Sequence, residues 1–111
     1  MPRIPRSYSK LTQEALLLLA GQIQLARKRR RMTEQDLAAR IGVARSTVQL
    51  IEKGAPSVGV GLMFEAAVLV GVDLFVPEAT TLAPELERMQ DKLALVPRSV
   101  RKPVRVIDDD F

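Results

Sequence analysis

The segment TEQDLAARIGVARSTVQLIEKG, residues 33–54, sets the expected fold because it predicts two short helices joined by a glycine turn. Thr33 can cap the first helix, since its hydroxyl can accept a backbone hydrogen bond, and the acidic residues that follow suit the positive end of the helix dipole. Gly42 can adopt the left-handed conformation that a sharp change of direction requires. The second helix is expected over residues 45–53.

The apolar residues of this segment have the spacing of two helices that pack closely across each other. Ala38 is expected at the crossing, where a larger side chain would push the helices apart, and Val43 in the corner between them. The outer face of the second helix is polar, with Arg45, Ser46, Thr47 and Gln49. Arginine and glutamine have the donors and acceptors that match the base edges of guanine and adenine. A helix that merely faces water could carry the same residues, so both interpretations are open at this point.

Amphipathic patterns on both sides of this segment predict an all-α fold of four to five helices. Thr12 is a candidate N-cap for a first helix that ends near Arg30, and a mostly buried helix is expected to end at Gly71. Residues 81–95 predict a last helix with Pro84 in its first turn and an apolar face, formed by Leu82, Leu86, Met89 and Leu93.

The segment VDLFV, residues 72–76, predicts a short strand that stops at Pro77. A lone apolar edge strand favours association, and pairing with the same strand of a second chain would bury Leu74 or Phe75. The alternative is a strand that packs within its own chain. The expected dimer interface comprises Val72, Leu74, Phe75 and Val76.

We expect the chain to divide into four parts: a flexible basic arm over residues 1–10, the DNA-binding domain over 11–71, the dimerisation strand and C-terminal helix over 72–96, and a flexible tail over 97–111. The tail alternates apolar and basic residues before three aspartates and a terminal aromatic. Such a segment can pair with the sheet edge of a partner, which makes Val104, Val106 and Phe111 candidate partner-binding residues. A solvated terminus without a function is the alternative.

The composition favours a polyanionic partner and argues against catalysis. The 111 residues include 17 Lys and Arg against 13 acidic residues, for a net charge of +4, and the isoelectric point is near 10.0. The chain has no cysteine and no histidine, so the usual general base and the commonest metal ligand are missing. We expect no enzyme, no metal and no cofactor. The longest apolar run, residues 15–20, is too short for a membrane span, which predicts a cytoplasmic protein.

From about residue 19 to residue 70, the chain resembles the phage-repressor-like, or Xre, helix-turn-helix family. The resemblance implies a repressor-like domain in which Arg45, Ser46 and Gln49 read base edges, and in which the DNA backbone is contacted by Arg27, Lys28, Thr33, Gln35, Thr47, Lys53 and Ser57. The family's usual glutamine is replaced by Glu34, and because a carboxylate cannot hold a phosphate we place no contact there. Arg27 and Glu52 also match family positions that form an ion pair between the first and third helices.

Beyond the fourth helix the chain is similar to HipB-type antitoxins, which pair a short strand with that of a second chain and contact the toxin through the C-terminal segment. The resemblance implies a dimer on an inverted-repeat operator, a HipA-like kinase toxin as partner, autorepression of the operon and association with the nucleoid. A phage or host repressor without a toxin is one alternative. A protein-interaction adaptor that does not bind DNA is another.

Overall fold

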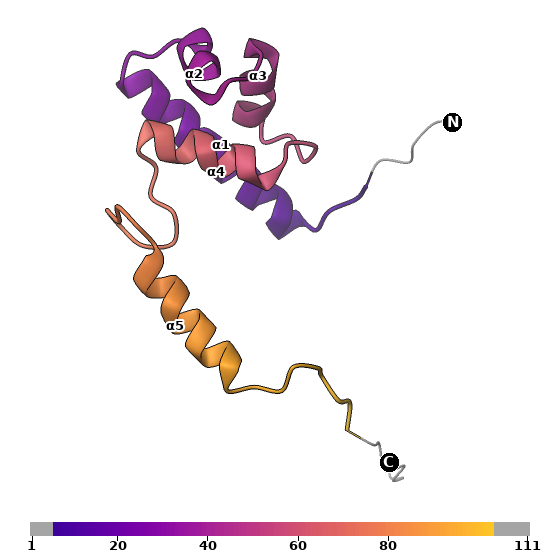
Figure 1. Ribbon diagram of the computed structural model, residues 1–111. Helices are drawn as coiled ribbons and strands as arrows, with labels where there is room; N and C mark the ends of the chain where they lie inside the picture. Colours follow the sequence, from indigo (N-terminus) through magenta and orange to yellow (C-terminus); the bar gives the residue numbers. More distant parts are fainter. Residues whose placement is uncertain (1–5, 104–111) are drawn as a thin grey trace. The chain divides into compact units, whose positions relative to one another are not determined.

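The computed structural model describes residues 6–103, and this range forms five α-helices (Figure 1). They are α1 (Lys10–Arg29), α2 (Glu34–Ile41), α3 (Arg45–Lys53), α4 (Val60–Val70) and α5 (Ala83–Ala94). The chain divides after Ala79 into two compact units, of which the first contains α1 to α4 and the second contains α5. No helix in the described range combines the length and the hydropathy that a membrane span requires.

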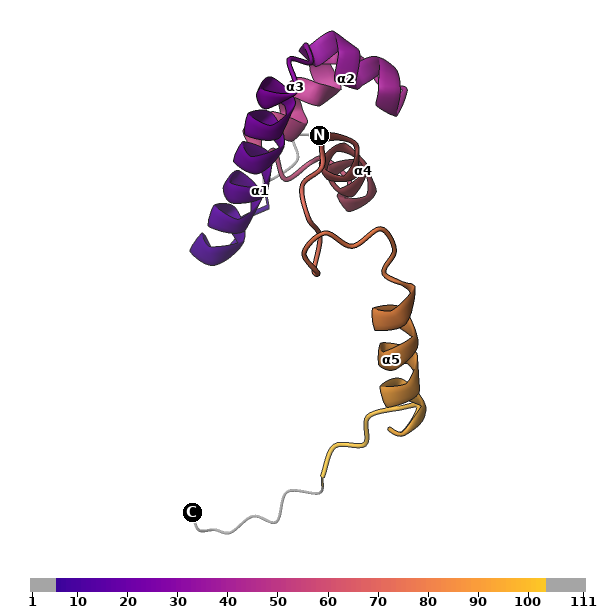
Figure 2. The same cartoon turned by 90° about the vertical axis from the view of Figure 1, so that its left-hand side faces the viewer.

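The first unit has one core, which all four of its helices build. Helix α1 packs against α3 and α4, and α2 packs against the same two helices (Figures 1 and 2). The fully or almost fully buried core residues are Ile23 of α1, Leu37 and Ala38 of α2, Val48 and Ile51 of α3, and Met63, Ala66, Ala67 and Val70 of α4. The small Ala38 is completely buried, as the predicted close crossing of helices requires.

Local capping explains where α2 begins and ends. The Thr33 hydroxyl accepts a hydrogen bond from the Asp36 backbone N–H at 3.0 Å, and the Asp36 carboxylate accepts one from the Thr33 N–H at 2.9 Å. Gly42 ends the helix with a φ of 83°. The predicted cap and glycine turn are confirmed, and so is the predicted extent of α3.

The prediction that Thr12 caps the first helix is wrong. Ser9 caps α1, because its hydroxyl accepts a hydrogen bond from the Thr12 N–H at 3.3 Å, and the helix begins at Lys10. Serine at this position satisfies a first-turn amide one turn earlier than expected. The basic arm expected over residues 1–10 therefore overlaps the helix at its last residue.

Gly54 brings the end of α3 against the first half of α1. Its φ is 71°, and a β-carbon built there would lie 3.0 Å from the backbone oxygen of Leu16. Backbone atoms cannot move aside as the end of a long side chain can, so this contact requires glycine. The close approach fixes α3 directly on the backbone of α1.

The strand predicted over residues 72–76 does not form in the described structure. Phe75 has a φ of 66°, which is incompatible with an extended strand, and the Val76 N–H donates to the Leu74 carbonyl at 2.7 Å in a tight turn. Val72 and Leu74 instead pack, half-buried, against the core of their own unit, while Phe75 is 82% exposed and meets Phe64 edge to face. The described residues therefore lack the strand on which the predicted dimer interface depends, and the interface itself stays a prediction.

The second unit contains the predicted last helix. Helix α5 carries Pro84 in its first turn, and the Thr81 hydroxyl accepts a hydrogen bond from the Ala83 N–H at 3.2 Å. A surface ion pair joins Glu85 and Arg88 at 2.9 Å. No residue of α5 is buried, so its own unit leaves the predicted apolar face largely uncovered.

Candidate nucleic-acid interface

Helix α3 presents its polar side outward because its apolar side is locked into the core. Val48 and Ile51 are completely buried, whereas Arg45 and Ser46 are exposed and Gln49 is partly exposed. This places the three predicted base-reading residues at the surface of a helix whose other side is buried. Thr47, predicted to contact the DNA backbone, is half-buried on the same helix.

Glu34, at the start of α2, binds two of the three predicted base-reading residues. Its Oε1 atom accepts hydrogen bonds from Arg45 Nε at 3.0 Å and from Gln49 Nε2 at 3.2 Å. These bonds lower the pKa of Glu34, with the Arg45 bond as the larger cause. Because folding lowers this pKa, the contact stabilises the fold at any pH above the pKa that Glu34 has in the unfolded chain. This stabilisation is lost as the pH falls through the pKa that Glu34 has in the folded chain.

The bonds to Glu34 leave the recognition groups of both side chains available. Arg45 uses Nε, so the two terminal Nη groups, on a side chain that is 62% exposed, can still donate a parallel pair of hydrogen bonds. Gln49 uses one amide hydrogen and retains the other together with its carbonyl oxygen. These are the groups that pair with guanine O6 and N7 and with adenine N7 and N6 in the major groove. Glu34 therefore orients the polar face of α3 without occupying it.

A buried ion pair ties α3 to the rest of the unit, as the resemblance implied. Arg27 donates from Nε to Glu52 Oε2 at 2.6 Å and from Nη2 to Glu52 Oε1 at 2.9 Å, and its Nη1 donates to the Met32 carbonyl at 2.8 Å. The two side chains are only 7% and 3% exposed. The bond to Glu52 is the main cause of the raised pKa of Arg27.

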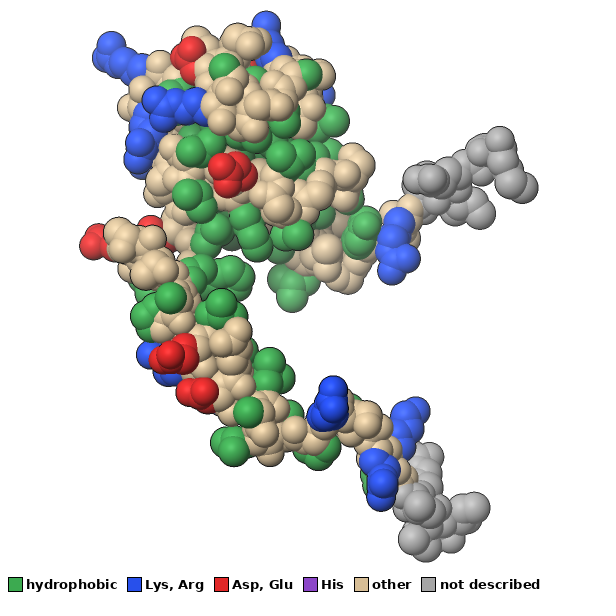
Figure 3. All heavy atoms as spheres, in the orientation of Figure 1, with side chains coloured by type: hydrophobic (Ala, Val, Ile, Leu, Met, Phe, Trp, Pro, Cys, Tyr) green, Lys and Arg blue, Asp and Glu red, His purple; other side chains and the backbone are tan. Residues whose placement is uncertain are grey.

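Arg27 cannot serve as the phosphate contact that was expected of it. Its guanidinium is buried and already donates to three acceptors inside the protein. The remaining backbone candidates differ in their freedom: Lys28, Gln35, Lys53 and Ser57 are exposed, while the exposed Thr33 uses its hydroxyl to cap α2. Basic side chains project around the end of α1 and the α2 and α3 part of this unit (Figure 3).

A shallow hollow of about 290 Å³ lies beside the polar face of α3. It is lined by Gln24, Glu34, Gln49, Glu52 and Lys53. Gln24 was not singled out from the sequence, and the one signal for it is its position one helical turn before Arg27. The amides of Gln24 and Gln49 and the Lys53 side chain therefore line this side of the polar face.

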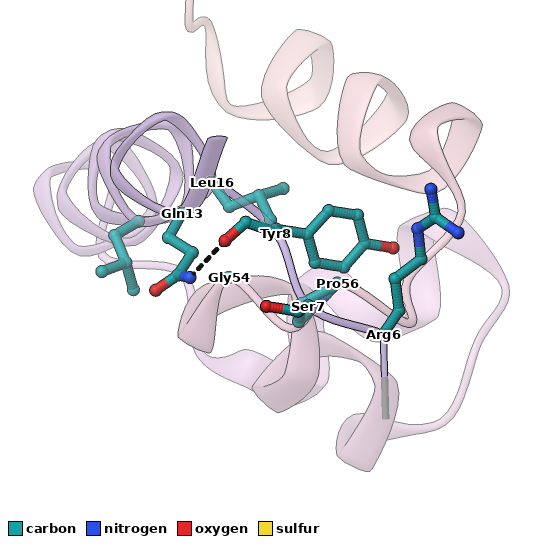
Figure 4. Close-up of a pocket in the computed structure, with 8 residues that line it drawn as sticks. Arg6, Ser7, Tyr8, Gln13, Leu16, Gly54 and Pro56 are labelled. Atoms are coloured by element: carbon teal, nitrogen blue, oxygen red, sulfur yellow. Dashed lines mark hydrogen bonds between the residues drawn. The ribbon is translucent and has the colours of Figure 1, made fainter. Parts of the chain in front are cut away.

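The described part of the basic arm lies on the other end of α3. Residues 6–8 line a more open hollow of about 480 Å³ together with α1 and the turn at Gly54 and Pro56 (Figure 4). The Gln13 amide donates to the Tyr8 carbonyl at 2.8 Å, and the Arg6 guanidinium lies 5.8 Å from the centre of the Tyr8 ring. From Arg6 onward, the arm is packed beside the helical domain.

Two other predictions concern the partner-binding tail and metal binding. The candidate partner-binding residues Val104, Val106 and Phe111 lie outside it. Within residues 6–103, no group of three or more acidic side chains is arranged to hold a metal ion.

Replacing Glu52 by glutamine is expected to destabilise the fold by about 3 kcal/mol, because the buried Arg27 charge loses its counter-charge. Urea denaturation followed by circular dichroism measures the change. Glu65→Gln, at an exposed position on α4, is the matched control and should change stability little. Equal stabilities of the two variants would contradict the structural role of the pair.

Replacing Glu34 by glutamine is expected to strengthen binding to random duplex DNA, by up to about tenfold at low salt, because one negative charge leaves the polar face. Preference among sequences should fall, since Arg45 loses the ionic partner that orients it. Fluorescence anisotropy on random and selected duplexes measures both effects, again with Glu65→Gln as the control for net charge. Unchanged preference would show that Glu34 does not orient the face.

The comparison with protein families agrees with this geometry. The family model described as Helix-turn-helix matches residues 23–75, which extend from the second half of α1 through α4 to the turn at Phe75. No curated protein and no solved structure matches the chain. The family match and the structure thus agree on a helix-turn-helix arrangement over this segment.

Proposed function

We propose that the chain is a sequence-specific regulator that binds double-stranded DNA and acts as a binding protein rather than an enzyme. The observation that carries this proposal is the outer face of α3, where Arg45 and Gln49 are held by Glu34 with their recognition groups available. Helix α3 would enter the major groove, where Arg45, Ser46 and Gln49 would meet base edges. The family match over residues 23–75 supports the same mode of binding.

Phosphate contacts would come from exposed residues around this face. Lys28 follows the buried Arg27 at the end of α1, Lys53 ends α3, and Gln35 lies in the first turn of α2. The N-cap residue of α3 is Ala44, whose side chain gives the first turn no capping hydrogen bond. Amides in such a first turn can donate to a phosphate, and the net positive charge would favour the approach of DNA. Such contacts position the helix, while the base contacts specify the sequence.

A narrower role follows only from the resemblance. In this proposal the protein binds an inverted-repeat operator as a dimer, represses its own operon at the nucleoid and holds a HipA-like kinase toxin. The absence of the strand at residues 72–76 removes one architectural reason for the antitoxin role. A kinase gene beside the gene for this chain, and copurification of the two products, would support that role, while a chain that represses without any such partner would be a repressor alone.

The experiment for DNA binding is selection from a random duplex library, followed by affinity measurements on the selected and random sequences. Arg45→Ala and Gln49→Ala should each weaken binding to the selected duplex by about 1–3 kcal/mol, because they remove base contacts. Gln49→Ala should affect random DNA little, while Arg45→Ala should also weaken binding to random DNA because it removes a positive charge. Lys28→Ala is the control for backbone contacts and should weaken both complexes similarly. Equal losses on both duplexes for the Gln49 variant would remove its base-reading role.

A complete lack of binding to duplex DNA at low salt would favour the adaptor function instead. The positive charge alone should give measurable nonspecific binding if the face meets DNA at all. The outcome therefore separates a regulator from an adaptor before any operator is known.

A further inference from the structure

Helix α5 carries an apolar stripe that its own unit leaves exposed. Leu86, Met89 and Leu93 are 57%, 52% and 61% exposed, and they continue toward Leu82 before the helix and Val96 after it. The five positions are spaced by four, three, four and three residues, which is the heptad pattern of a helix that packs along another helix. Apolar side chains gather along α5, with acidic groups beside them (Figure 3).

We propose that α5 pairs antiparallel with α5 of a second copy of this chain. In that arrangement the stripe is complementary to itself, since Leu82 would face Leu93 of the other copy and Leu86 would face Met89. A two-fold axis between the helices repeats each of these contacts. The opposed helix dipoles would also attract each other.

The charges beside the stripe favour this occupant and this orientation. Glu85 and Lys92 hold equivalent heptad positions, each one residue before a core leucine. In an antiparallel pair, Glu85 of each copy would lie beside Lys92 of the other, which gives two opposite-charge contacts. In a parallel pair, Glu85 would instead lie beside Gln90, and Lys92 would face the segment after the helix at Pro97. The self-complementary charges thus favour a second copy, antiparallel, as the partner.

This inference names an interface for the dimer of the narrower proposal, but it does not rest on that proposal, because the pairing is expected without DNA. It would supply a two-fold axis that the predicted strand at residues 72–76 does not provide. Because α5 is short, pairing through it alone should be of modest strength and should depend on protein concentration.

Sedimentation equilibrium of the full chain without DNA tests the pairing. We expect a reversible dimer, and we expect Leu86→Glu to weaken it by about tenfold or more, because a charge would enter the apolar stripe. Glutamate is a good helix former, so α5 itself should persist. Leu95→Glu is the matched control: Leu95 is 86% exposed but lies off the stripe, and the dimer should be retained.

Charge exchange tests the orientation. Glu85→Lys alone and Lys92→Glu alone should each weaken the dimer, since each places like charges beside one another. An equimolar mixture of these two variants should associate as a heterodimer, because one copy then carries lysine at both positions and the other glutamate. A monomeric wild-type chain at every concentration, retention of the dimer by Leu86→Glu, or a mixture no stronger than its components would overturn the proposal.

Discussion

The position of α3 depends on one buried guanidinium. Arg27 joins three segments at once: the end of α1, the Met32 carbonyl in the following turn, and Glu52 on α3. A helix as short as α3, with nine residues, is marginal in isolation, so its orientation must come from tertiary contacts. Arg27 binds both carboxylate oxygens of Glu52, which fixes the orientation of that side chain. The close contact at Gly54 fixes the end of the same helix. The polar side chains of α3 are held in defined positions because the opposite side of the helix is fixed in the core.

Glu34 adds a second level of order at the surface. It brings a negative charge to a face that is proposed to meet a polyanion, which should reduce affinity for any DNA. In return it restrains Arg45 and Gln49, two long side chains that would otherwise lose conformational freedom on binding. A carboxylate at this position therefore favours discrimination between sequences over general affinity.

The helices of the first unit could be predicted because their signals are local. Each signal involves residues only a few positions apart: the cap at Thr33, the turn at Gly42, and core residues spaced by three or four positions. The segment VDLFV misled because a short apolar run does not reveal whether it pairs as a strand or closes the core of its own unit. Here Val72 and Leu74 do the latter.

The site was only partly visible in the sequence for a related reason. The outward residues of α3 follow from its periodicity, but the contacts of Glu34 join residues 11 and 15 positions apart across a turn. Such contacts depend on how two helices cross, which no linear pattern contains. Glu34 stands where the family that the sequence resembles usually has glutamine. The sequence alone indicates only that a phosphate contact is lost there, and it does not reveal the bonds to Arg45 and Gln49. The apolar face of α5 was evident from spacing, whereas its exposure needed the structure.

The proposed function depends on contact between the outer face of α3 and DNA. Nuclear magnetic resonance of the isotope-labelled chain, titrated with a short duplex at low salt, tests it most directly because no operator needs to be known. The account predicts the largest shifts at the backbone amides of residues 45–49 and in the first turn of α2, with α5 little changed. Binding that shifts α5 alone, or that leaves residues 45–49 unchanged, would contradict it.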